Sequence, residues 1–436
     1  MKMTFNFNYG LVRIDRVTTR AYGVLWRWHF LAGLAACPIL AIVALTGALY
    51  CFQPELDRWA NRELVEVEPA GTRRPLDELL ATATSRACTP SGVYAPGDPR
   101  RAMVVYCTEG ARREVFIDPY RGAVVGAREV GGSFFGVVFA LHWELLLGDV
   151  GRYAIEWATS WCVLLAASGL VLWWPRGKRR GGGVWWPRRR LRDRQWLRDL
   201  HAVAGAYTLP VLIALAATGL MWTALAGDRR WRPLTEDAAQ QVFDHPPVST
   251  AASSPRVGYA AALAAAGIDL ASERRAIYFS PIGAEPDAAY SFYVYDDSYE
   301  APSLAEGVWI DAYRGAVLRR VTWSDRSAIG KLDGARYAIH VGALLALPGR
   351  IAACAAALVL AALCITGPWM WWKRRPRGKL GLPPRTRRVA WPALAALAAI
   401  GWVLPMVGWT LVALAAIELV VWWRSTRAQL TAPPRP

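Results

Sequence analysis

His29-Phe-Leu-Ala-Gly33, followed by Pro38 and Thr46-Gly47, recurs later in the chain. The second copy reads His201-Ala-Val-Ala-Gly205 and is followed, at the same spacing, by Pro210 and Thr218-Gly219. An internal repeat of this kind predicts that the chain is built from two similar halves.

A second set of landmarks follows each copy at matching offsets. The first set is His142, Gly151-Arg152, Gly169 and Trp173-Trp174, and the second is His340, Gly349-Arg350, Gly367 and Trp371-Trp372. Each half also contains a polar segment with one similar string, Ile117-Asp-Pro-Tyr-Arg-Gly-Ala-Val-Val125 or Ile310-Asp-Ala-Tyr-Arg-Gly-Ala-Val-Leu318. The repeat therefore covers the larger part of the chain.

The composition predicts a membrane protein. Of 436 residues, 54% are hydrophobic, which is high for a soluble protein. A membrane span needs roughly 20 predominantly apolar residues, and four segments meet this need: 26–52, 153–174, 202–225 and 351–372. A fifth tract, 391–423, is too long for one ordinary span and contains Gly401, Pro405 and Gly408. We predict that it forms a hairpin of two short helices.

The net charge of +17 does not indicate nucleic acid, because the charges follow a membrane pattern. Segments 1–27, 175–200 and 373–390 hold 5, 10 and 8 basic residues against 1, 2 and 0 acidic ones. These segments are expected to be cytoplasmic by the positive-inside rule. The long segments 54–150 and 226–349 are slightly acidic and are expected to be exported. The pattern predicts a bacterial inner-membrane protein with both termini in the cytoplasm.

Each exported segment is predicted to form a small α+β domain. Residues 103–107 and 276–280 alternate as strands do, 76–86 and 259–266 are typical of helices, and Tyr-Arg-Gly indicates a turn. Cys88 and Cys107 both fall in the first exported segment, where a disulfide is permitted, and the sequence leaves their pairing open.

Four of the chain's five histidines occupy symmetry-related positions at span ends. Ionisable residues in membrane segments are rare and are commonly functional. The alternative for a single histidine is that it only forms a hydrogen bond between two helices. Symmetry pairs His29 with His201 near the cytoplasmic face and His142 with His340 near the outer face. The fifth, His245, lies in a polar exported loop and is expected to be a solvated surface residue.

Paired imidazoles on facing helices are typical of haem ligands. Neutral imidazole suits iron, copper and zinc. The histidines have no Cys, Asp or Met partner at metal spacing, so they fit the two axial positions of a haem better than tetrahedral zinc. We predict two b-type haems, one near each face, held by His29, His201, His142 and His340. Together they would carry electrons across the bilayer.

Two further pairs of residues are candidates for haem contacts. Gly33 and Gly205 lie one turn after His29 and His201 on the same helix face, where a missing side chain leaves room for a porphyrin edge. Close helix packing is the alternative. Arg152 and Arg350, at the outer ends of their spans, are candidates for propionate partners. Their alternative role is anchoring at the membrane interface.

The predicted fold is an α-helical polytopic membrane protein. Two two-helix units, related by a pseudo-twofold axis along the membrane normal, form a four-helix haem-binding bundle with a C-terminal hairpin and two small periplasmic α+β domains. The predicted segments are 1–25 (cytoplasmic), 26–52 (first span), 53–132 (periplasmic domain), 133–174 (His142 and second span), 175–200 (cytoplasmic loop), 201–225 (third span), 226–330 (periplasmic domain), 331–372 (His340 and fourth span), 373–390 (cytoplasmic loop), 391–423 (hairpin) and 424–436 (cytoplasmic tail).

The chain resembles the PepSY-associated transmembrane (PepSY_TM) proteins, an iron-regulated inner-membrane group that includes ferric-siderophore reductases. The resemblance covers most of the chain, and the Ile-Asp-x-Tyr-Arg-Gly strings are similar to the PepSY signature, with Pro119 replaced by Ala312 in the second. The strings that carry it are Arg27-Trp-His-Phe-Leu-Ala-Gly33, Leu141-His-Trp-Glu-Leu-Leu-Leu-Gly148, Leu200-His-Ala-Val-Ala-Gly205, and His340 with Gly349-Arg350. The four histidines match the family's histidine positions.

The resemblance implies a di-haem b reductase that passes electrons from the cytoplasmic side to a ferric siderophore or another Fe(III) chelate in the periplasm, releasing Fe(II). The chain has no Gly-x-Gly-x-x-Gly fingerprint, so the donor is expected to be a separate flavin reductase or a quinol. A siderophore or iron transporter and a peptide-binding regulatory membrane protein without redox activity are the alternatives. No substrate contact is assigned. Four aromatic residues either line a contact surface or form the packed face of a strand: Tyr290, Tyr293, Tyr295 and Trp309.

Overall fold

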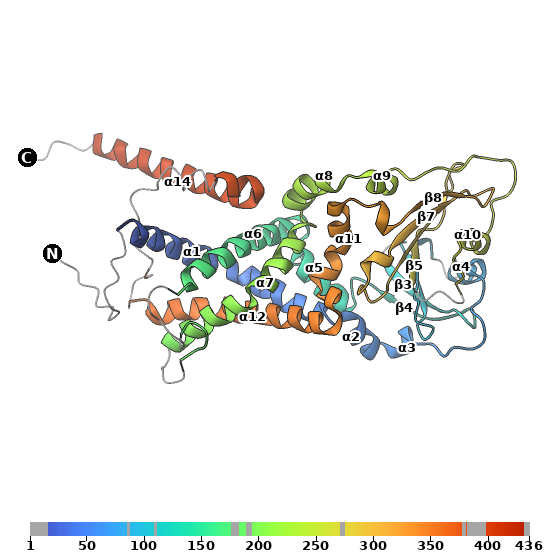
Figure 1. Ribbon diagram of the computed structural model, residues 1–436, viewed down its shortest axis with the longest axis horizontal. Coiled ribbons are helices and arrows are strands. Elements are labelled where there is room, and N and C mark those ends of the chain that lie inside the picture. Colours follow the sequence, from blue (N-terminus) through green and yellow to red (C-terminus); the bar gives the residue numbers. More distant parts are fainter. Residues whose placement is uncertain are drawn as a thin grey trace, which may run out of the picture. The chain divides into compact units, whose positions relative to one another are not determined.

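The structure is a computed structural model that describes residues 16–84, 88–108, 111–175, 183–188, 194–270, 275–376, 381 and 398–430. Among these residues, four helices are long and apolar enough to cross a membrane (Figure 1). They are α1 (Arg16–Tyr50), α6 (Gly148–Trp173), α7 (Arg194–Leu220) and α12 (Ala346–Arg374). The chain is therefore a polytopic membrane protein with four candidate spans and a separate region of β-sheet.

The shorter helices connect the candidate spans to the sheet or cover it. They are α2 (Gln53–Ala60), α3 (Arg62–Val65), α4 (Leu76–Thr84), α5 (Phe134–Glu144), α8 (Arg232–Thr235), α9 (Ala238–Asp244), α10 (Tyr259–Ala265) and α11 (Ala328–His340), with a π-helix at Ala224–Trp231. The histidine-bearing helices α5 and α11 both begin at a serine, Ser133 or Ser327, whose side chain accepts a hydrogen bond from the backbone of the first turn.

The C-terminal tract contains the interruption that its sequence predicts. The helical backbone breaks at Leu404, and α14 (Pro405–Leu430) starts at the proline. Gly401 and Gly408 approach so closely that a Cβ on Gly401 would lie 2.8 Å from the Cα of Gly408, which only glycine permits. Residues 391–397 lie outside the described residues, so the membrane topology of the predicted hairpin stays a prediction.

The chain divides into two compact units, and the division falls inside the four long helices. Unit 1 comprises Met1–Ala44, Ala154–Ala217 and Ala356–Pro436, and unit 2 comprises Leu45–Tyr153 and Thr218–Ala355. The core of unit 1 is a helix interface in which Ala32, Ala36 and Ala158 are buried. Small residues allow membrane helices to pack closely, which gains dispersion energy that lipid contacts would not supply.

Unit 2 contains one antiparallel sheet of eight strands. Its order, β4-β3-β2-β1-β5-β6-β7-β8, places the strands of segment 54–150 in one half of the sheet and those of segment 226–349 in the other. The strands are β1 (Pro90–Ala95), β2 (Met103–Cys107), β3 (Arg113–Asp118), β4 (Ala123–Glu129), β5 (Ala276–Phe279), β6 (Tyr290–Tyr295), β7 (Glu306–Ile310) and β8 (Val317–Val321). The predicted strands at 103–107 and 276–280 and the predicted helix at 259–266 are confirmed to within one residue at their ends. The predicted helix at 76–86 is confirmed over 76–84, and residues 85 and 86 lie outside the described residues.

The prediction of two separate α+β domains needs correction, because segments 54–150 and 226–349 share this sheet. Strand β1 pairs with β5, with Val93 opposite Phe279, Tyr94 opposite Tyr278 and Ala95 opposite Ile277. If each segment formed its own sheet, β1 and β5 would be edge strands, each with a row of unpaired backbone N–H and C=O groups. Pairing β1 with β5 satisfies these groups in both strands. The two segments also share one hydrophobic core, in which α4 and α10 lie on the same face of the sheet (Figure 1).

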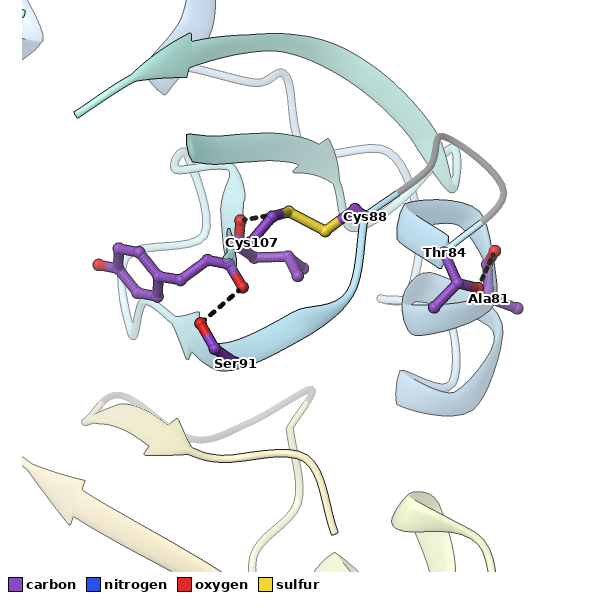
Figure 2. The surroundings of a disulfide bond; sticks show 7 residues. Ala81, Thr84, Cys88, Ser91 and Cys107 are labelled. Carbon is purple, nitrogen blue, oxygen red and sulfur yellow. Dashed lines mark hydrogen bonds between the residues drawn. A yellow bond between two sulfur atoms is a disulfide. The ribbon is translucent and has the colours of Figure 1, made fainter. Parts of the chain in front are cut away.

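A disulfide joins Cys88 and Cys107, which settles the pairing that the sequence leaves open (Figure 2). Both residues are buried in the shared core. Cys107 lies at the end of β2, and nearby the Ser91 hydroxyl donates to the carbonyl oxygen of Tyr106, 3.2 Å away (Figure 2). The bond therefore links the chain before β1 to β2 in the half of the sheet formed by the first segment.

This pairing predicts the outcome of cysteine alkylation. The chain has 7 cysteines, and 5 of them are free thiols. Denatured, unreduced protein should take up five alkyl groups, and reduced protein seven, as counted by intact mass. In a Cys88→Ser variant, reduction should add no further label. Seven labels on unreduced wild-type protein would contradict the disulfide.

Candidate functional site

Each of the four repeated histidines is hydrogen-bonded to the hydroxyl of a Ser or Thr that immediately precedes a glycine. All four imidazole rings are half-buried. The distances from Nδ1 to the hydroxyl oxygen are 2.9 Å for His29 with Ser168, 3.1 Å for His142 with Thr46, 3.0 Å for His201 with Thr366 and 3.0 Å for His340 with Thr218. The glycines that follow are Gly169, Gly47, Gly367 and Gly219. One local arrangement therefore occurs four times.

The arrangement obeys the internal repeat. In the first half, α1 and α6 form one contact through His29 and Ser168, and α1 and α5 form the other through Thr46 and His142. In the second half, α7 takes the place of α1, α12 that of α6, and α11 that of α5. Each half thus builds its two histidine contacts by itself.

The glycines leave space next to the imidazoles. A Cβ built on Gly47 would lie 3.0 Å from Cε1 of His142, and one on Gly219 would lie 3.2 Å from Cε1 of His340. The corresponding distances are 3.3 Å between Gly169 and His29 and 3.6 Å between Gly367 and His201. The first three are closer than ordinary van der Waals contact, so glycine lets the ring approach the neighbouring helix backbone.

Across the repeat, the histidines come together in pairs. The ring centroids of His142 and His340 are 6.2 Å apart with an angle of 64° between the rings, and both residues belong to unit 2. His29 and His201 both belong to unit 1 and are close enough to interact electrostatically. These are the pairs that symmetry predicts.

The surroundings of His340 include residues that sequence reasoning missed. The indole of Trp222 lies edge-on to its ring, with centroids 5.3 Å apart. The guanidinium of Arg336, one turn earlier on α11, lies 5.1 Å from the Trp222 ring centroid and pairs with Asp333. The first half has Val138 at the position that matches Arg336. The internal repeat therefore did not indicate that Arg336 lies near a histidine site.

Gly33 and Gly205 pack against leucines of a neighbouring helix. A Cβ on Gly33 would lie 3.7 Å from Leu165, and one on Gly205 would lie 3.5 Å from Leu363. Both distances are ordinary van der Waals contacts. The geometry thus favours the helix-packing alternative for these two glycines, and their predicted contact with a porphyrin stays a prediction.

Arg152 and Arg350 both have protein partners. Arg152 lies 3.5 Å from the carboxylate of Asp149 and packs over the ring of Trp143. Arg350 donates to the carbonyl oxygen of Cys51 at 2.7 and 2.9 Å and forms a two-pronged ion pair with Glu55. This guanidinium holds the pKa of the Glu55 carboxyl below its ordinary value. Arg350 therefore fastens the end of α1 to the start of α12, and the propionate role of both arginines stays a prediction.

The two Ile-Asp-x-Tyr-Arg-Gly strings form hairpin turns. Asp118 and Asp311 each accept hydrogen bonds from the backbone N–H groups two and three residues later. The Ala312 N–H donates to the buried Ser249 hydroxyl at 2.8 Å, a bond that Pro119 cannot make. The difference between the strings is thus explained by packing. Both Asp side chains serve the turn.

The described residues contain no group of three or more His, Cys, Asp or Glu side chains placed to hold a metal ion. His245 is exposed at the C-terminal end of α9, as a surface histidine should be.

Four apolar helices, a sheet region and paired histidines define a polytopic membrane protein with two imidazole sites. The chain belongs to the family described as the PepSY-associated TM region, whose family model matches residues 26–374. No curated protein matches the chain. The match includes all four paired histidines and the eight-stranded sheet.

The glycine distances predict opposite effects for one substitution at two positions. Gly47→Ala should destabilise the protein by about 1–3 kcal/mol, because the new methyl group crowds His142. Gly367→Ala should be neutral or stabilise it by up to about 1 kcal/mol, because the methyl group fits and alanine favours the helix. Thermal unfolding in detergent measures both. Equal losses at the two positions would contradict the assigned ring positions.

Proposed function

We propose that the chain is a di-haem b electron-transfer protein of the bacterial inner membrane that works as a ferric-siderophore reductase. Electrons would come from a cytoplasmic flavin reductase or a quinol and would pass to a periplasmic Fe(III) chelate, releasing Fe(II). The observation that supports this most directly is the fourfold contact of an imidazole with a hydroxyl and a glycine.

The histidine contacts suit axial haem ligands. A hydroxyl on Nδ1 orients the ring and directs Nε2 to act as the iron ligand, as outer-shell hydrogen bonds do in other metal sites. The ring centroids of His142 and His340 are 6.2 Å apart, so the two imidazoles are close enough that one haem iron could be held between them. The glycines remove bulk beside the rings. The residues present thus fit a bis-histidine haem.

A haem bound at each pair would supply one-electron chemistry. The chain's own contribution would be to ligate the haem iron, to orient the ligating imidazoles and to shield the haem from water. Thr46 and Thr218, which contact His142 and His340, are buried. His142 with His340, and His29 with His201, would hold one haem each, and the haem would supply electron transfer rather than oxygen chemistry.

The pairing predicts which haem each histidine holds. His142→Ala and His340→Ala should each remove the same haem, and the double variant should lose no more than either single one, because one missing ligand already empties the site. His29→Ala and His201→Ala should remove the other haem. A pyridine haemochrome assay counts the haems per chain, and reduced-minus-oxidised spectra show which of the two haems is lost.

Two outcomes of that experiment would contradict the proposal. Wild-type protein that lacks haem after haem-replete expression would favour a transporter or a peptide-binding regulatory protein. Loss of the same spectral component in His142→Ala and His29→Ala would contradict the pairing.

The reductase activity can be tested with a redox-inert control. Dithionite-reduced protein mixed with a ferric siderophore should reoxidise its haems and yield Fe(II), captured by a ferrous chelator, in proportion to the electrons lost. The gallium complex of the same siderophore should leave the haems reduced, because Ga(III) accepts no electron under these conditions. Haems that stay reduced with every Fe(III) chelate would contradict the activity.

A further inference from the structure

One face of the eight-stranded sheet carries a group of tyrosines. Alternate residues of β1, β2, β5 and β6 point into the shared core, as Val93, Val105, Ile277 and Val294 do. The residues between them therefore face the other side. We call this side the tyrosine face; its tyrosines are Tyr94, Tyr106, Tyr278, Tyr293 and Tyr295. Tyr290 belongs to the core, so the candidate contact residues of β6 divide between the two faces.

At one place on this face, side chains from both exported segments meet. The phenol of Tyr94 donates to the carboxylate of Asp297. Arg101 donates to the Tyr94 oxygen at 3.1 Å and to Asp297 at 2.9 Å. The first segment thus supplies a phenol and a guanidinium, and the second supplies a carboxylate.

Two more phenols adjoin this group. The rings of Tyr295 and Tyr299 lie against each other, with centroids 5.4 Å apart, and both phenols are close enough to Tyr94 and Asp297 to interact electrostatically. Tyr299 has a φ of 59°, a left-handed conformation that a bulky residue rarely adopts. It is 36% exposed, so the cluster reaches the surface. Such strain is typically kept where a side chain has a specific task.

The cluster is also connected to the outer histidine pair. The rings of Tyr299 and Tyr337 are 4.5 Å apart. Tyr337 lies on α11, one turn before His340. All of these residues belong to unit 2. The phenols and the carboxylate are therefore placed beside the helix that carries a proposed haem ligand.

Phenol and carboxylate oxygens are hard donors that suit a small, highly charged cation, and tyrosine is an established ligand of ferric iron. We propose that Tyr94, Tyr295, Tyr299 and Asp297 form the site at which Fe(III), the acceptor in the proposed reductase reaction, is received from its chelate. This inference rests on the proposed function and names the acceptor site. Each phenol that binds the metal would release its proton to solvent.

The charges around the cluster support this assignment. Arg101 places a positive charge next to Asp297 and Tyr94. A guanidinium there favours an anionic co-ligand, which a chelate delivering the iron would supply.

Ga(III) tests the site without electron transfer, because it has the charge and ligand preference of Fe(III) and is not reduced. Full-length, haem-loaded protein would be equilibrated with gallium citrate by dialysis, and bound gallium would be measured by elemental analysis. Wild-type protein should retain one Ga(III) per chain. A Tyr295→Phe/Tyr299→Phe variant keeps the rings and loses two ligand oxygens, so its affinity should fall at least tenfold.

Two controls separate binding from folding and from the reductase proposal. Tyr293→Phe, on the same strand and face but packed against Phe243, should bind Ga(III) as wild type does. The haem spectrum of each variant reports that the protein is folded. Equal gallium binding in the double variant and wild type, or no retention by wild type, would overturn the site whether or not the haems transfer electrons.

Discussion

The hydrogen bond between an imidazole Nδ1 and a neighbouring hydroxyl is the interaction on which the helical part of the molecule depends. In an apolar environment a polar ring needs a partner, because an unsatisfied polar group costs several kcal/mol in hydrocarbon. Ser168, Thr46, Thr366 and Thr218 supply that partner from another helix. The glycines after Thr46, Thr218 and Ser168 permit the close approach of the ring. The contact thereby fixes the rotation and depth of two helices at once.

The sequence predicted the positions of the four histidines because helical spacing and the repeat together determine them. It also predicted the strands β2 and β5, the helices α4 and α10, and an interruption of the C-terminal tract near Pro405. Ser168 and Thr366 were missed, although each precedes a glycine as Thr46 does. A contact between two helices depends on how each is rotated, and a single segment does not reveal this. The repeat could not show the partner of Arg350 for the same reason.

Pairing between distant segments also lay beyond local patterns. Strand β1 already pairs with β2 of its own segment, and no pattern in its sequence predicts that its other edge pairs with β5. The tyrosine face follows from that pairing, since Tyr94 and Asp297 come from different halves and meet only in the joined sheet. A surface built in this way can carry different side chains from each half, which two identical domains could not offer.

The β1–β5 pairing gives the sheet the form of a dimer interface contained within one chain. Either half alone would end at β1 or β5, with the outer row of backbone groups of that strand exposed. Two copies of one half could pair these strands antiparallel about a twofold axis, as Tyr94 and Tyr278 pair now. Because both halves belong to one chain, they need not be identical, and Pro119 in one stands where Ala312 stands in the other.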